Sequence, residues 1–158
     1  MSDTSAGSSI ILKIVPPVWL LTFLLLGIVV HYLFPTARVF DVSFPIAGGV
    51  LFVAGLALTL YSSSLFTKEK TEILPTSPTN RVLITYGSFR FTRNPMYLGM
   101  VMGLLGVALF LGSLPVYLTP LAQFLVLNFA FIPFEEKKMA RLFGAQYEAY
   151  RQRVRRWL

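Results

Sequence analysis

Four long apolar runs constrain this chain more than any other feature of its sequence. They lie at Val15 to Phe34, Phe44 to Phe66, Met96 to Gly112 and Val116 to Phe134. A helix needs about 20 residues to cross the hydrocarbon core of a bilayer, with a range of about 17 to 25. Inside that core a helix also satisfies its own backbone hydrogen bonds. The pattern therefore predicts an all-α integral membrane protein with four transmembrane helices.

The short connection between the last two runs adds a topological constraint. Only Ser113-Leu114-Pro115 separates them, so we expect a tight antiparallel helical hairpin. The composition agrees with a membrane protein, because 55% of the residues are hydrophobic and only 13% are charged. The absence of cysteine excludes thiolate and disulfide chemistry, and the single histidine, His31, argues against a histidine metal cluster.

The basic residues predict how the chain is oriented. The chain has 14 lysines and arginines. If it crosses the membrane four times, all of them except Arg38 lie on the same side of the membrane. Because cytoplasmic loops carry an excess of Lys and Arg, both termini and the long loop from Thr67 to Arg93 are predicted to be cytoplasmic. The net charge of +7 is then explained by anionic lipid headgroups, and nucleic-acid binding is not expected.

The whole chain, residues 1–158, is predicted to form one domain, with residues 1–12 as a tail without fixed structure. A cleaved signal peptide is not expected, because the first apolar run exceeds a signal core and no small-residue cleavage pattern follows it. The segment from Glu135 to Leu158 has apolar residues at helical spacing and is predicted to be an amphipathic cytoplasmic helical segment. Gly144 is expected to divide it, because glycine commonly follows the end of a helix.

Two polar features at the membrane border suggest chemistry. The stretch Arg93-Asn94-Pro95-Met96-Tyr97-Leu98-Gly99, called the motif below, begins the third run. Proline suits the first turn of a helix, and a loop-to-helix junction offers backbone donors and a partial positive charge to an anionic group. The second feature is the pair Glu135 and Glu136, since carboxylates at this depth are costly unless solvated or paired.

Simpler readings exist for each of these residues. Arg93 alone fits an interfacial anchor that reaches toward headgroups, and the glutamates fit a solvated helix start. Tyr97 alone fits a membrane-belt aromatic. Gly103 and Gly106 are predicted to permit close packing between helices.

The combination of several segments in order resembles a known family. These segments are Gly87 to Gly99, the hairpin, Glu135-Glu136, Phe143 to Tyr150 and Val154 to Trp157. Together they resemble the isoprenylcysteine carboxyl methyltransferases and the related phospholipid N-methyltransferases, over the chain from about Leu83 onward. The resemblance implies an S-adenosylmethionine-dependent membrane methyltransferase, with residues 83–158 as its cofactor-binding part.

The resemblance also implies roles for individual residues. Glu135 or Glu136 would hold the cofactor ammonium, and Arg93 or nearby backbone donors would hold its carboxylate. Tyr97 and Tyr147 would line the adenosine or sulfonium region. The residues implied as catalytic are Arg93 and Glu135. The residues implied as cofactor-binding are Arg93, Asn94, Pro95, Tyr97, Leu98, Gly99, Glu135, Glu136, Tyr147 and Arg156.

The acceptor class follows less directly. Prenylcysteine members of the family usually carry histidine where this chain has Asn94, and asparagine offers no proton switch near neutral pH. The resemblance therefore favours a bacterial-type inner-membrane enzyme with a lipid-like or hydrophobic acceptor, methylated at a carboxylate, amine or thiol. Two alternatives stay open. The chain could be an NADPH-dependent relative of the sterol-type reductases, which have a comparable arginine-proline-tyrosine motif. It could also be a non-catalytic membrane scaffold.

Overall fold

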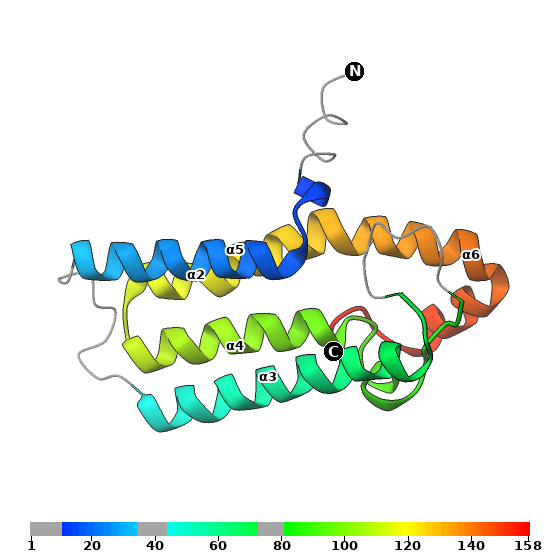
Figure 1. Cartoon of the computed structure of the whole chain (residues 1–158), viewed down its shortest axis with the longest axis horizontal. Coiled ribbons are helices and arrows are strands. Elements are labelled where there is room, and N and C mark those ends of the chain that lie inside the picture. Colours follow the sequence, from blue (N-terminus) through cyan, green and yellow to red (C-terminus); the bar gives the residue numbers. More distant parts are fainter. Residues whose placement is uncertain (1–10, 35–43, 73–80) are drawn as a thin grey trace, which may run out of the picture.

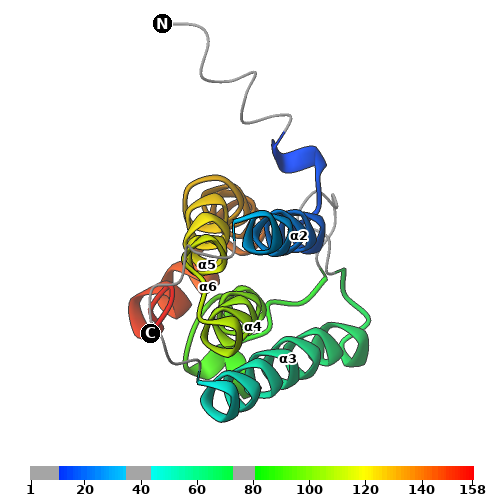
Figure 2. The ribbon, with the colours of Figure 1, turned by 90° about the vertical axis from the view of Figure 1, so that its left-hand side faces the viewer.

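The computed structural model describes residues 11–34, 44–72 and 81–158. Its main helices run side by side along the long axis of the molecule (Figure 1): α2 (Pro16–Leu33), α3 (Pro45–Lys68), α4 (Pro95–Leu111) and α5 (Leu114–Val126). Viewed end-on, α4 lies between α3 and α5, and α2 lies beside α5 (Figure 2). The prediction of an all-α fold is confirmed.

Proline and glycine fix the ends of these helices. α2, α3 and α4 each begin at a proline, Pro16, Pro45 and Pro95, where the missing N–H has no intrahelical partner to lose. α4 ends at Gly112, whose φ of 64° lies in the left-handed region that favours glycine. Ser113 is the N-cap of α5, so the predicted hairpin is present.

Glycines allow α3 and α4 to approach closely. A Cβ added to Gly99 would lie 2.3 Å from Thr59 Oγ1 and 2.5 Å from the carbonyl oxygen of Gly55. A Cβ on Gly106 would lie 2.6 Å from a backbone nitrogen of α3, which agrees with the packing role predicted for Gly106. A Cβ on Gly103 would meet no atom within 4 Å, so its missing side chain is not what permits the approach. Small residues serve close helix packing in membranes.

The last predicted span, Val116 to Phe134, and the first part of the amphipathic segment form one continuous helix. α5 passes through a five-residue π-helix, η2 (Leu127–Phe131), into α6 (Ile132–Arg153). The wider π turn, in which the N–H of Ile132 donates to the carbonyl of Leu127, lets the chain continue past Pro133, which has no N–H to donate.

The apolar surface agrees with an integral membrane protein. α2, α3 and the helical stretch Leu114–Arg153, which contains the break at Gly144 described below, are long and apolar enough to cross a membrane, and α4 is a shorter apolar helix of 17 residues. Two predictions concern residues outside the described ranges: most of the tail at 1–12, and the opposite-side loop that carries Arg38.

One end of the bundle carries the polar segments. The 3₁₀-helix η1 (Gly87–Arg90) and the motif precede α4 there, and α6 extends beyond the bundle at the same end (Figure 1). Gly144 interrupts α6 with φ 48° and ψ −123°, which confirms the predicted break. After it the chain turns back toward the start of α4 (Figure 1).

Candidate functional site

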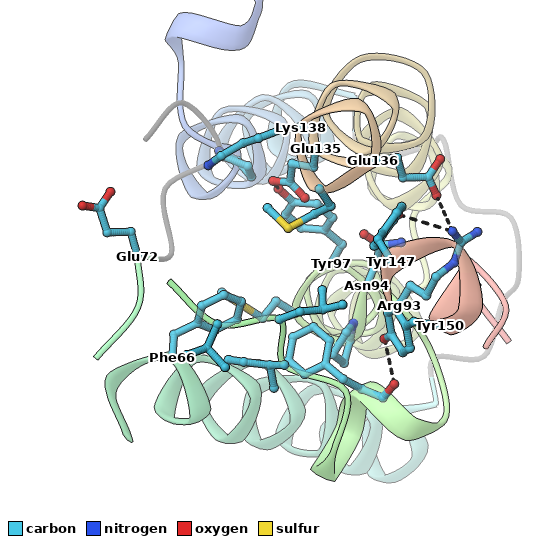
Figure 3. Close-up of a pocket in the computed structure, with 18 of the residues that line it drawn as sticks. Phe66, Glu72, Arg93, Asn94, Tyr97, Glu135, Glu136, Lys138, Tyr147 and Tyr150 are labelled. Atoms are coloured by element: carbon cyan, nitrogen blue, oxygen red, sulfur yellow. Dashed lines mark hydrogen bonds and ion pairs between the residues drawn. The ribbon is translucent and has the colours of Figure 1, made fainter. Parts of the chain in front are cut away.

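A cavity of about 250 Å³ lies at the polar end of the bundle. Its walls come from the start of α2, the end of α3, the segment before η1, the motif, the first turns of α4, and α6 on both sides of its kink. Figure 3 shows the charged and aromatic side chains facing it mainly from the motif and α6. The cavity therefore collects residues that are more than 100 positions apart in the sequence.

The motif enters α4 as predicted. Asn94 is the N-cap residue, and Pro95 is the first residue of the helix. Asn94 makes no side-chain cap; its Nδ2 instead donates to the carbonyl of Arg156 at 2.9 Å. The backbone N–H of Arg93 donates to the carbonyl of Arg155, also at 2.9 Å. The motif loop is thus held by the segment that follows α6.

Glu136 lies between two guanidinium groups. Arg156 binds it in a bidentate way, with Nη2 at 2.6 Å from Oε2 and Nε at 3.1 Å from Oε1. Nη1 of Arg93 lies 3.2 Å from the same Oε1 and donates to the hydroxyl of Tyr147 at 3.4 Å. Arg93 and Glu136 are largely buried, with side chains 11% and 15% exposed. Paired, hydrogen-bonded charges can remain at such a site at far lower cost than lone ones.

Glu135 has a different environment from its neighbour. Its carboxylate accepts a hydrogen bond from the hydroxyl of Tyr97, a buried residue in the first turns of α4. In Figure 3 this carboxylate lies beside Tyr97 and near Lys138, away from the guanidinium of Arg93. The two neighbouring glutamates therefore place their carboxylates on different sides of the site, Glu135 at Tyr97 and Glu136 at the arginines.

Two tyrosines of α6 close the site beyond the Gly144 kink. Tyr150 donates its hydroxyl to the carbonyl of Phe89 in η1 at 2.8 Å. Burial raises the pKa of Tyr147, and the Glu136 carboxylate acts in the same direction, while Arg93 opposes it. Tyr147 is therefore a neutral phenol at physiological pH, able both to donate and to accept a hydrogen bond.

The rest of the wall is apolar. It is formed by the start of α2, by the end of α3 and by the segment before η1, through residues Val15, Pro16, Pro17, Phe66, Val82, Leu83, Ile84 and Phe89, together with Met96, Met100 and Met139. Sites for small molecules are typically apolar cavities into which a small number of polar groups point. Among the described residues no group of three or more His, Cys, Asp or Glu could hold a metal ion.

The structure brings together most of the residues singled out in the sequence. Seven of them line the cavity: Arg93, Asn94, Pro95, Tyr97, Glu135, Glu136 and Tyr147. Arg156 does not line it and reaches it only through Glu136. The two others lie elsewhere, since Leu98 faces a shallow groove beside Phe91 and Gly99 packs against α3. We therefore exclude Leu98 and Gly99 from the lining of the cavity.

Several lining residues escaped the sequence reasoning. Val15, Pro16 and Phe66 carry no signal that separates them from lipid-facing residues of the same runs. Lys138 fits the polar face of the predicted amphipathic segment, and Tyr150 fits its apolar stripe, so neither residue stands out by its position in the pattern. For Tyr150 a signal existed, because a tyrosine on an apolar stripe usually finds a partner for its hydroxyl when buried.

Comparison with known proteins gives three matches. A family model described as phospholipid methyltransferase matches residues 44–146. An uncharacterized protein of Haemophilus influenzae is 40% identical over 63 residues, which are 40% of this chain and 100% of that protein. The solved structure of the eukaryotic intramembrane Ras methyltransferase ICMT, an isoprenylcysteine carboxyl methyltransferase, matches with a TM-score of 0.67 at 21% identity. That match covers 90% of this chain and 51% of the other, so this chain spans about half its length and shares its fold.

Proposed function

The chain belongs to the phospholipid methyltransferase family, and from that premise we propose that it transfers a methyl group from S-adenosylmethionine to a lipid-like or hydrophobic acceptor. The observation that carries this proposal is a cavity at the polar end of the bundle with a half-buried carboxylate, that of Glu135, on one side and the guanidinium of Arg93 on the other. We also propose that this end and both termini are cytoplasmic, where the cofactor is available.

The donor set suits the amino-acid end of the cofactor. Its ammonium needs a carboxylate, and its carboxylate needs hydrogen-bond donors. We propose that Glu135 takes the ammonium, because Glu136 already binds both Arg156 and Arg93. Arg93 lines the cavity, and within the described chain its buried Nε has no hydrogen-bond partner. We propose that the Arg93 guanidinium, which contacts Glu136 and Tyr147 through Nη1, holds the cofactor carboxylate through its remaining N–H groups.

The aromatic residues suit the rest of the cofactor. When bound, S-adenosylmethionine supplies an electrophilic methyl group on a cationic sulfur. The faces of Tyr97 and Tyr147, both in the cavity wall, attract a cation, and the buried position of Tyr97 excludes water from its side of the site. Their task in a methyl transfer is to align donor and acceptor, since in-line displacement depends mainly on positioning.

The apolar wall suits an acceptor that comes from the bilayer. The cavity, at about 250 Å³, is at or below the lower end of the range for ligand sites, about 300 to 1,000 Å³. We propose that only the reactive end of the acceptor enters it, past Val15, Pro16 and Phe66, while the apolar remainder stays among the helices and lipid. In this arrangement residues 1–158 act as one domain, and residues 83–158 supply most cofactor contacts.

Calorimetry on the protein in lipid nanodiscs tests the cofactor. We expect binding of S-adenosylmethionine, at least tenfold weaker binding in Glu135→Gln, and no binding of NADPH. Binding of NADPH alone would favour a reductase, and binding of neither would favour a scaffold. Incubation with methyl-labelled S-adenosylmethionine, followed by lipid extraction and mass spectrometry, then identifies the acceptor and the methylated atom.

A further inference from the structure

The five residues after α6, Val154 to Leu158, form a strap across the motif loop. The backbone leaves the helix at Val154, which has extended dihedral angles. Three hydrogen bonds then join the strap to the motif and its neighbour: Arg93 N to Arg155 O at 2.9 Å, Asn94 Nδ2 to Arg156 O at 2.9 Å, and Thr92 Oγ1 to Arg156 O at 3.1 Å. The position of the strap therefore sets the position of the motif.

A second contact fixes the strap to a distant part of the molecule. The indole N–H of Trp157 donates to Oδ1 of Asn128 at 3.0 Å. The Trp157 ring also packs on Phe124, with the ring centroids 4.9 Å apart. Asn128 belongs to the π-helix η2, and Phe124 lies in the last turn of α5. The strap thus bridges the motif on one side and the continuous helix on the other.

The π-helix gives this bridge its geometry. A π turn holds more residues than an α turn, so side chains on its two sides are rotated relative to an uninterrupted α-helix. Asn128 lies within the turn, whereas Glu135 and Glu136 follow it on α6. The same turn therefore sets both where Asn128 meets Trp157 and where the two glutamates meet Tyr97 and the arginines.

We propose that Asn128 and Trp157 are positioning residues for the cofactor site, acting through the strap on Arg93 and Asn94. Neither side chain lines the cavity, so neither touches the reactants. The proposal rests on the proposed function for its effect on S-adenosylmethionine, but the attachment of the strap can be measured without any ligand. The two ideas can therefore fail separately.

The chain offers a matched control because it has two tryptophans. Trp19 also donates its indole N–H to a backbone oxygen, that of Ile11 at 3.3 Å, and also stacks on a phenylalanine, Phe23, at 5.6 Å. Replacing Trp19 with Phe leaves Trp157 as the sole tryptophan. Its emission then reports the surroundings of the strap.

The first measurement uses the protein in nanodiscs without ligand. In the Trp19→Phe background, Asn128→Leu should shift the emission of Trp157 to longer wavelength and speed tryptic cleavage after Arg153 and Arg155, which are already exposed. Asn128→Asp keeps an oxygen acceptor and should restore both readouts. Unchanged emission and cleavage in Asn128→Leu, at an unchanged melting temperature, would overturn the attachment.

The second measurement is the affinity for S-adenosylmethionine. Asn128→Leu and Trp157→Phe should each weaken it about fivefold to tenfold, the size expected for one lost hydrogen bond, whereas Trp19→Phe should not. The double variant should be no weaker than either single variant, because both remove the same contact. Additive losses, or wild-type affinity in both single variants, would contradict the positioning role. Failure of the wild-type protein to bind S-adenosylmethionine would instead contradict the proposed function. The fluorescence measurement would then still test whether Asn128 and Trp157 attach the strap.

Discussion

The hydroxyl of Tyr97 donates a hydrogen bond to the carboxylate of Glu135 and so joins the first turns of α4 to the start of α6. α4 and the continuous α5–α6 helix are the two arms of the hairpin, and this hydrogen bond holds the Glu135 carboxylate against α4. A hydrogen bond to a charged group contributes about 1.5 to 3 kcal/mol.

Tyr97→Phe removes this hydroxyl and keeps the ring. We expect the affinity for S-adenosylmethionine to fall at least tenfold, because the carboxylate loses the group that orients it. Calorimetry measures the change, and Tyr32→Phe is the control, since Tyr32 lies at the far end of α2 and is 75% exposed. Equal affinity in the two variants would show that Glu135 needs no orienting partner.

Glu136→Gln removes the charge that Arg93 and Arg156 share. We expect a loss of about 1 to 3 kcal/mol in stability, below the cost of breaking a fully buried pair because the Arg156 side chain is 36% exposed. Thermal unfolding in detergent, followed by tryptophan fluorescence, gives the shift in melting temperature.

Glu148→Gln is the matched control for Glu136→Gln. Glu148 pairs with Arg151 at 3.4 Å, and the two side chains are 48% and 53% exposed. Exposed pairs contribute about 0 to 1 kcal/mol. If Glu148→Gln loses as much stability as Glu136→Gln, the burial of the Arg93–Glu136–Arg156 ion pairs does not add to the stability of the protein.

Gly99→Ala should separate α3 from α4, because the new Cβ would lie 2.5 Å from the carbonyl oxygen of Gly55. Overpacking of this kind costs about 1 to 3 kcal/mol. Gly103→Ala, one turn along the same helix, meets no atom within 4 Å and should be neutral or stabilising by up to about 1 kcal/mol. Melting temperatures of the two variants test this, and a reversed order would contradict the packing.

The orientation of the chain can be tested by single-cysteine labelling, because the natural sequence has no cysteine. Gln152→Cys places a thiol at an exposed position of α6, and Thr36→Cys places one between the first two spans. We expect a membrane-impermeant maleimide to label position 36 in intact cells, and position 152 only after the membrane that holds the protein is permeabilised. The opposite pattern would overturn the cytoplasmic assignment.

The sequence predicted the features that depend on local pattern. Apolar runs of sufficient length predicted the helices, Pro95 predicted the start of α4, and Gly144 predicted the break in α6. The Glu135-Glu136 doublet at a membrane border predicted a polar site. Each of these depends on neighbours in the chain, whose physical preferences can be read from residue type alone.

The features that the sequence did not predict depend on contacts between distant segments. The sharing of Glu136 by Arg93 and Arg156, and the pairing of Asn128 with Trp157, join residues whose individual surroundings give no hint of a partner. The sequence also does not predict the π-helix η2, because its mainly apolar residues fit a regular α-helix just as well. Gly99 was placed in the cofactor site since it belongs to the motif, yet its contacts with α3 are those of a packing residue.

The continuous helix that begins at Leu114 and runs to the break at Gly144 has a mechanical consequence. Its length, residues 114–143, corresponds to about 45 Å at about 1.5 Å per residue, which is well beyond the roughly 30 Å of the hydrocarbon core. Glu135 and Glu136 lie on the same rod as the residues embedded in lipid, with no loop between them. Any change in bilayer thickness that tilts the rod therefore also displaces both carboxylates, so the geometry of the cavity is coupled to the membrane around it.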